Sequence, residues 1–97
     1  MTTPPLAENG NTVPVSVAVD APQLEEKYVK AIHLFAAGNP RPEVASFHFS
    51  LRNGKAAAST RIRLAKTQQV IALAEMSDGQ LMRTQNEVKV TIGGCGG

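Results

Sequence analysis

Residues 12–19 read TVPVSVAV, and this short stretch decides the fold class. Its apolar residues fall at every second position, and smaller or polar residues stand between them: Val13, Val15, Val17 and Val19 alternate with Pro14, Ser16 and Ala18. Such alternation indicates a β-strand with one buried face. Because proline has no N–H to donate to a neighbouring strand, Pro14 favours an edge or a bulge of the sheet.

The same alternation recurs in stretches that are separated by turn signals: VASFHFSL (44–51), AASTRIRLA (57–65) and QQVIALAEM (68–76). Asn53-Gly54 is a strong hairpin signal and predicts that residues 44–51 pair with 57–65. SDGQ (77–80) predicts a turn after the third stretch. Residues 80–92 read either as one long strand with a weak middle or as two short strands.

Residues 22–37 are ambiguous. Leu24, Tyr28, Ala31 and Phe35 fall at helical spacing, yet YVKAIHLFA (28–36) also reads as a strand rich in β-branched and aromatic residues. Periodicity leaves both alternatives open. The remaining short strands at regular spacing indicate a sandwich or a barrel, with these residues sharing the core: Val13, Val15, Val17, Phe47, Phe49, Ile62, Leu64, Val88 and Val90.

Composition narrows the function classes. The 97 residues make one domain, and a formal net charge of +2 is too small to argue for a nucleic-acid partner. Basic residues do not alternate with aromatic ones, so we predict no nucleic-acid interface. No apolar run approaches the roughly 20 residues of a membrane helix, and we expect no membrane partner. A single cysteine allows no internal disulfide and no cysteine-rich metal site.

That cysteine, Cys95, stands third from the end, between Gly93-Gly94 and Gly96-Gly97. Glycine flanks remove bulk around the sulfur and free the backbone. Three extended residues after Ile92 reach about 10 Å, which suits insertion of the thiol into a cleft of another protein. The tail holds no cation to activate the thiol, so it suits carrying a group better than catalysis. The alternative is an incidental cysteine on a disordered terminus.

Other candidate residues have plainer interpretations. His33 and His48 lie on expected strands without a neighbouring carboxylate at a metal spacing, which favours packing or surface roles, and we predict no metal site. A basic face would form if the predicted hairpin brought together two groups of cations: Arg61, Arg63 and Lys66 on one side, Arg52 and Lys55 on the other. Such a face could attract an anion or an acidic partner, although a solvated strand face is the commoner meaning.

The tail KVTIGGCGG (89–97) resembles the C-terminus of the SoxY family, the cysteine-bearing sulfur carrier subunits of the bacterial thiosulfate-oxidising (Sox) system. Five more blocks resemble that family in the same order: AENGNTVPVSV, YVKAIHLFAAGNP, VASFHFS, STRIRLAKTQ and VIALAEMSDG. The resemblance covers residues 6–97.

The resemblance implies an all-β, immunoglobulin-like β-sandwich of about seven strands over residues 6–92, which makes 28–36 a strand. It implies that Cys95 is the covalent attachment point and that Gly93, Gly94, Gly96 and Gly97 form a flexible swinging arm (residues 93–97). The chain would be a carrier and not an enzyme, with no cofactor besides sulfur intermediates bound covalently to Cys95.

It also implies a setting and a set of partners. The carrier would work in the periplasm with a second small subunit, SoxZ. A c-type cytochrome would join thiosulfate to Cys95 as Cys–S–S–sulfonate, and a metal-dependent hydrolase would release sulfate and leave a persulfide. A molybdenum sulfane dehydrogenase would oxidise the outer sulfur. Because Cys95 has no intramolecular partner, a Cys95–Cys95 homodimer is a further expectation.

The chain departs from the family at its start. SoxY precursors carry an export signal and mature chains a further N-terminal segment, whereas only MTTPPLA precedes the ENGNTVP block here. We therefore expect a truncated chain whose residues 1–5 are disordered or derive from the trimming. Two rival functions remain: a ubiquitin-like sulfur carrier that works through a thiocarboxylate on Gly97, and an immunoglobulin-like binding module with an irrelevant tail.

Overall fold

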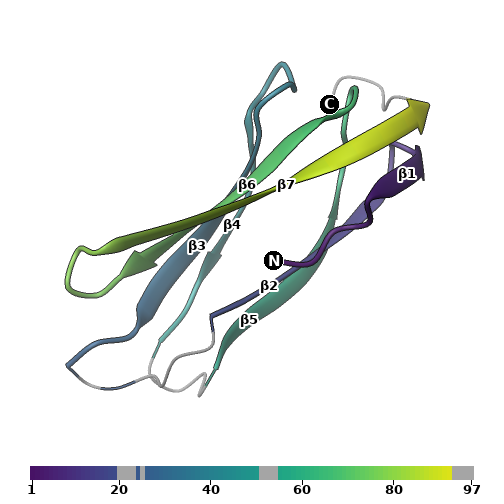
Figure 1. The fold of residues 1–97 in the computed structure, drawn as a ribbon. Helices are drawn as coiled ribbons and strands as arrows, with labels where there is room; N and C mark the ends of the chain where they lie inside the picture. The colour runs from purple at the N-terminus through teal and green to yellow at the C-terminus, as the bar shows by residue number, and fades with distance from the viewer. Residues whose placement is uncertain (20–23, 25, 51–54, 93–97) are drawn as a thin grey trace.

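The computed structural model describes residues 1–19, 24, 26–50 and 55–92. These residues form an elongated body of 44 × 19 × 17 Å built from strands (Figure 1). In chain order the strands are β1 (Leu6–Asn9), β2 (Val13–Val19), β3 (Val29–Ala36), β4 (Glu43–His48), β5 (Ala56–Ile62), β6 (Gln68–Met76) and β7 (Leu81–Ile92). The described residues include no helix, so the strand interpretation of residues 28–36 is confirmed and the helical one is wrong.

The strands form two sheets that face each other, one with the order β1-β7-β6-β3-β4 and one with only β2 and β5. This is the predicted all-β sandwich. Apolar side chains at alternate positions of facing sheets interdigitate in such a sandwich and bury its core. The 12 residues of β7 make one long strand, the first of the two alternatives for residues 80–92. The turn at SDGQ is confirmed by Gly79, which has a φ of 89° and donates its N–H to Met76 O at 3.0 Å.

The expected core residues divide into two groups. Six are buried, with exposures of 5% or less: Val13, Val15, Val17, Ile62, Leu64 and Val88. The other three, Phe47, Phe49 and Val90, are partly buried and pack against that core. The two phenylalanines lie on or just after β4, an edge strand, where one flank has no neighbouring strand to cover the side chains. A second set of buried residues comes from the central strands β3 and β6, which include Ile32, Leu34 and Val70.

The hairpin expected around Asn53-Gly54 is wrong, and Asn53 and Gly54 themselves lie outside the described residues. β4 pairs with β3 in the larger sheet, whereas β5 pairs with β2 across the sandwich. Alternation specifies that each strand has one apolar face, but both sheets present such a face to the same core. The pattern therefore cannot say to which sheet a strand belongs.

Two short segments at the N-terminus complete the sheets. β1 runs parallel to the end of β7, with Leu6 opposite Lys89 and Asn9 opposite Ile92. Before it, Thr2 forms an antiparallel bridge with Ser16 of β2. Backbone hydrogen bonds join Thr2 to Ser16 and the carbonyl of Pro5 to Lys89 N. Pro14 lies two residues before Ser16 on the same free edge, as its missing N–H predicts.

Leu34 in the middle of β3 tests this packing because none of its surface is exposed. Leu34→Ala is expected to lower the free energy of unfolding by about 2–5 kcal/mol, since it removes buried methyl groups and leaves a cavity. Leu81→Ala, at a side chain that is 59% exposed, is the matched control and should change it by less than about 0.5 kcal/mol. Urea unfolding measures both, and equal losses would contradict the described core.

Candidate functional site: the root of the C-terminal arm

The predicted site residues, Cys95 and the arm glycines Gly93, Gly94, Gly96 and Gly97, lie outside the described residues. The structure describes the chain up to Ile92, the last residue of β7, whose side chain is 65% exposed. The site is therefore built from the residues that hold the root of the arm.

Backbone hydrogen bonds fix this root. Gly10 donates its N–H to the carbonyl of Ile92 at 2.7 Å, and its own carbonyl accepts from Leu64 N at 2.8 Å. The hydroxyl of Thr67 accepts from Val90 N at 2.9 Å on the other flank of β7. Since Leu64 lies two residues after the end of β5 and Gly10 directly follows β1, the end of β7 is joined to both sheets. The residue that carries the arm is thus set in a rigid end of the sandwich.

A buried network of hydrogen bonds around Asn39 and Gln68, the polar knot, supports the 63–67 loop, which reaches the root. Asn39 is 6% exposed and Gln68 8%. The Asn39 side chain donates to Arg63 O at 2.7 Å and accepts from Ala65 N at 3.0 Å and from Gln68 Nε2 at 2.8 Å. Gln68 in turn accepts from Gly38 N at 2.8 Å. Buried polar groups with all partners in place define a loop conformation, because each lost bond would leave an unpaired group.

Gly38 is also where this knot packs most tightly. A Cβ atom there would lie 3.0 Å from Lys66 Cε and 3.2 Å from Gln68 Cβ. A glycine at this position therefore lets the 37–42 loop approach the 63–67 loop.

Three cations lie close in sequence to Leu64, the residue that joins the root through Gly10. Arg61, Arg63 and Lys66 are exposed and lie in or beside the segment that contains Leu64. Arg61 Nη1 donates to Thr12 Oγ1 at 3.5 Å, and none of the three forms an ion pair among the described residues. The basic face expected across a hairpin is wrong in its composition: Lys55 precedes the far end of β5, opposite the end of β2 at Val19, and Arg52 lies outside the described residues. Three of the five cations, Arg61, Arg63 and Lys66, remain within a few residues of Leu64.

The two histidines lie away from this end, on the outer face of the larger sheet. His33 Nδ1 lies 2.8 Å from Ser46 Oγ and His33 Nε2 lies 3.7 Å from Glu75 Oε1. The rings of His33 and His48 meet edge to face with centroids 6.2 Å apart. In the part of the chain that the structure describes, no group of three or more His, Cys, Asp or Glu side chains could hold a metal ion. No helix of the described residues is long and apolar enough to cross a membrane.

The chain is similar to a known family of proteins. A model of the family "Sulfur oxidation protein SoxY" matches residues 1–95. The chain belongs to the SoxY family. A solved structure of the sulfur carrier protein SoxY from Chlorobium limicola f thiosulfatophilum shares 40% identity and has a TM-score of 0.76. The match covers 94% of this chain and 76% of the solved one. The resemblance seen in the sequence is confirmed, and SoxY membership makes this chain a sulfur carrier of sulfur oxidation.

Other solved structures share the fold at lower identity. The superoxide reductase (neelaredoxin) from Ignicoccus hospitalis has a TM-score of 0.79 at 18% identity, covering 92% of this chain and 76% of that one. A putative superoxide reductase from Thermotoga maritima has a TM-score of 0.76 at 20% identity, covering 92% and 82%. At these identities the likeness shows the fold alone. No curated protein matches the chain.

Sequence reasoning singled out residues 93–97 and did not single out the residues that hold the root. Gly10 and Asn39 sit in turn-like stretches, GN and GNP, and Gln68 is the first residue of the strand pattern QQVIALAEM. The one available signal was an asparagine just before Pro40 in an otherwise apolar stretch, and it does not reveal which distant carbonyl the side chain will meet.

Asn39→Ala is expected to lower the free energy of unfolding by about 1–3 kcal/mol, because it leaves buried partners of the knot unpaired. Gln85→Ala is the control: its side chain accepts only an exposed hydrogen bond from Arg83, at 2.8 Å, and its loss should cost less than about 0.5 kcal/mol. Amide exchange adds a local readout, since Leu64 should exchange faster in Asn39→Ala. An unchanged rate at Leu64 would show that the knot does not support the root.

Proposed function

We propose that the chain holds thiosulfate-derived intermediates covalently on Cys95 and presents them in turn to the enzymes of thiosulfate oxidation. The observation that carries this proposal is the pairing of two opposite features at one end of β7. Ile92, the residue that directly precedes the arm, is held by Gly10 in a framework that joins both sheets. The next five residues include four glycines and one thiol.

The chemistry of loading is an oxidation. The Cys95 thiolate and the outer sulfur of thiosulfate join as Cys–S–S–SO₃⁻, and two electrons leave to a c-type cytochrome. Water then splits the S–SO₃ bond on a metal-dependent hydrolase, releasing sulfate and two protons and leaving the persulfide Cys–S–S⁻. A molybdenum sulfane dehydrogenase then oxidises the outer sulfur of the persulfide to a sulfonate, Cys–S–SO₃⁻: three water molecules supply the oxygen atoms, six protons are released and the dehydrogenase takes up six electrons before the next hydrolysis. In each step the reacting sulfur is held on Cys95 of the carrier, and the partner enzyme supplies the catalytic groups.

The surroundings of the root support this proposal electrostatically. Thiosulfate and the sulfonate intermediate are anions, and Arg61, Arg63 and Lys66 are the exposed cations of the loop and strand end beside Ile92. Exposed cations contribute mainly to encounter rates and are screened by salt. We place the chain in the periplasm, with a SoxZ-like second subunit, on the strength of its family.

The two rivals differ in what they need. A ubiquitin-like carrier needs a β-grasp fold with a helix, and the described residues form a seven-stranded sandwich without one. A plain binding module leaves the arm without a function, and the separation of rigid root and glycine-rich end speaks against it.

The intact mass of the chain, isolated from cells that grow on thiosulfate, tests the attachment. The C-terminal peptide is expected to carry the mass of a thiosulfate-derived group or of added sulfur, and Cys95→Ala should carry none. Sulfur that persists in Cys95→Ala would place the cargo on the Gly97 carboxyl and would support the thiocarboxylate rival. An unmodified wild-type peptide would contradict the carrier proposal at Cys95.

Storage without reductant is expected to produce a homodimer linked by Cys95–Cys95, because an unhindered thiol with no intramolecular partner oxidises against a second chain. Non-reducing gels of the wild type and of Cys95→Ser measure it. The dimer band should disappear with reductant and be missing from the serine variant. A covalent dimer that persists in Cys95→Ser would refute the disulfide.

A further inference from the structure

Asn9, the last residue of β1, stands directly before Gly10, the residue that ties the end of β7 to both sheets. An asparagine that is followed by glycine is especially prone to deamidation, because glycine has no side chain to hinder attack of its backbone nitrogen on the asparagine side chain. Asn9 is exposed, whereas Gly10 is buried. A reactive pair of residues thus forms part of the tie that holds the arm.

Hydrogen bonds hold both partners of this reaction apart. Gly10 N donates to Ile92 O at 2.7 Å, and Gly10 O accepts from Leu64 N at 2.8 Å. The side chain of Asn9 is engaged as well, since its Oδ1 accepts from Asn11 N at 2.9 Å. Deamidation needs the Gly10 nitrogen to lose its proton and to turn towards Cγ of Asn9. Neither can happen while that proton is donated to Ile92.

We propose that Asn9 is a site of spontaneous deamidation, that the Gly10–Ile92 hydrogen bond protects it, and that its conversion to isoaspartate releases the root of the arm. The reaction needs water and no enzyme or cofactor. The proposal goes beyond the carrier function and does not involve Cys95, so a failure of either one leaves the other unaffected.

The reaction has two steps. The Gly10 nitrogen gives up its proton and bonds to Cγ of Asn9; the bond from Cγ to the side-chain nitrogen breaks, and ammonia leaves with that proton. The product is a five-membered succinimide ring. Water then opens the ring at one of its two carbonyl carbons. Opening at the backbone carbonyl gives isoaspartate, and opening at Cγ gives aspartate. No atom is oxidised or reduced.

Isoaspartate lengthens the backbone at the tie. Its main chain runs through Cβ and Cγ, which places one extra atom between Cα of residue 9 and the nitrogen of Gly10. In the native register Asn9 lies opposite Ile92, and Gly10 faces Ile92 and Leu64 at the same time. The extra atom displaces the N–H and the C=O of Gly10 together, so the residue cannot keep both bonds. The end of β7 then loses its connection to the smaller sheet.

Local opening of the end of β7 controls the rate of this reaction. Proteins open locally, and the ends of strands open more easily than the centre of a sheet. Two further bonds hold this end: Thr67 Oγ1 accepts from Val90 N at 2.9 Å, and Lys89 N donates to Pro5 O at 3.1 Å. A variant that weakens one of them should expose the Gly10 nitrogen more often and make deamidation faster.

A comparison with a peptide tests the protection. The peptide carries residues 6–12, Leu-Ala-Glu-Asn-Gly-Asn-Thr, and both samples are kept at mildly alkaline pH. Asn9 in the folded chain is expected to deamidate at least about tenfold more slowly than in the peptide, and the chain unfolded in guanidinium chloride should match the peptide. Fragment mass spectra assign the product to residue 9, because Asn53-Gly54 is a second Asn-Gly pair.

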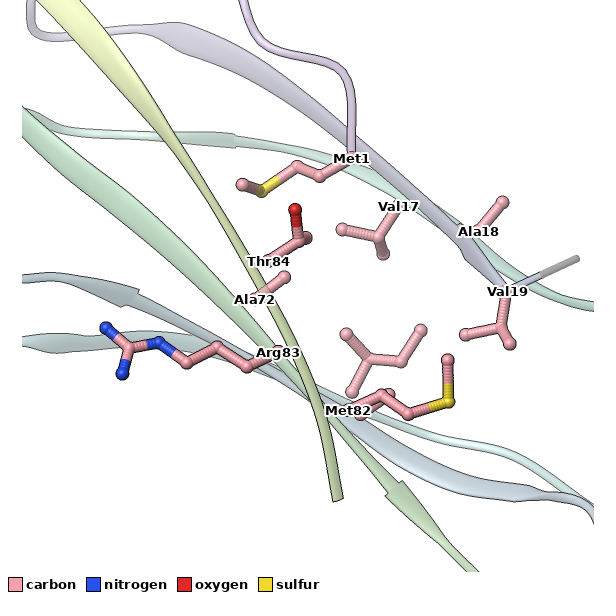
Figure 2. A pocket seen from close by; sticks show the side chains of 10 residues that line it. Met1, Val17, Ala18, Val19, Ala72, Met82, Arg83 and Thr84 are labelled. Atoms are coloured by element: carbon pink, nitrogen blue, oxygen red, sulfur yellow. The ribbon is translucent and has the colours of Figure 1, made fainter. Parts of the chain in front are cut away.

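Two threonine variants test the dependence on β7. Thr67→Val removes the hydroxyl that holds Val90 N and should speed deamidation of Asn9 about two- to tenfold, the effect of one hydrogen bond. Thr84→Val is the matched control in the other half of β7, where Thr84 lines a hollow of about 390 Å³ between the sheets (Figure 2). It should leave the rate within about twofold. Urea midpoints show that both variants fold, and exchange of the Gly10 amide should rise together with the deamidation rate.

Protein with isoaspartate at residue 9, separated by ion exchange through its added negative charge, tests the release of the root. Its Leu64 amide should exchange at least about tenfold faster than in the unmodified chain. Asn9→Asp adds the same charge without lengthening the backbone, and should leave that exchange within about twofold.

Three results would overturn the proposal. The first is a rate in the folded chain equal to that in the peptide. The second is an equal acceleration by Thr67→Val and Thr84→Val. The third is the same Leu64 exchange in the isoaspartate form and in Asn9→Asp, which would show that the modification does not release the root.

Discussion

The hydrogen bonds on either side of Gly10 are the constraint on which the functional end of the molecule depends. The N–H of Gly10 holds the carbonyl of Ile92, and its carbonyl holds the N–H of Leu64. One residue thereby ties the last residue of β7 to the end of the opposite sheet. Without this tie, the last strand would lose its hold on the β2–β5 layer at the point where the arm begins.

The same tie explains why several distant segments meet there. Leu64 can reach Gly10 only if the 63–67 loop takes one conformation. Asn39 and Gln68 hold the loop in that conformation through hydrogen bonds to the backbone of Arg63, Ala65 and Lys66. Arg63 and Lys66 belong to that loop, and Arg61 lies two residues before it in β5. A tethered group samples a smaller volume when the origin of its tether does not move, and this suits the proposed presentation of the Cys95 thiol to partner enzymes.

The sequence allowed the strands to be predicted better than their neighbours. Alternation located β2 and β6 and selected Val13, Val15 and Val17 as core residues, because side chains on a strand change face at every residue. It did not distinguish the strands around Asn53-Gly54 as members of different sheets, since that depends on which edges are free.

The ambiguity at residues 22–37 has a local cause. β3 contains a register shift between Val29 and Ala31, after which Ala31 and Ile32 are both buried. This interrupts the period of two and leaves a spacing that a helix would also show.

The residues of the candidate site could likewise be predicted only in part. Cys95 and its glycines are evident in the linear sequence, whereas Gly10 and Asn39 act through partners that are 82 and 24 residues away, and the sequence carries no sign of those contacts.

The path of the N-terminal segment links the two sheets. That segment pairs with β2 at Thr2, leaves it, and joins β7 at Leu6. By changing sheets it closes the sandwich at the arm end, whereas Val19 and Met82 line a hollow at the other end. One short segment thus contacts both sheets, through Thr2 on β2 and through Leu6–Asn9 on β7. Its second contact runs beside the end of β7, so the same segment that bridges the two sheets also flanks the root of the arm.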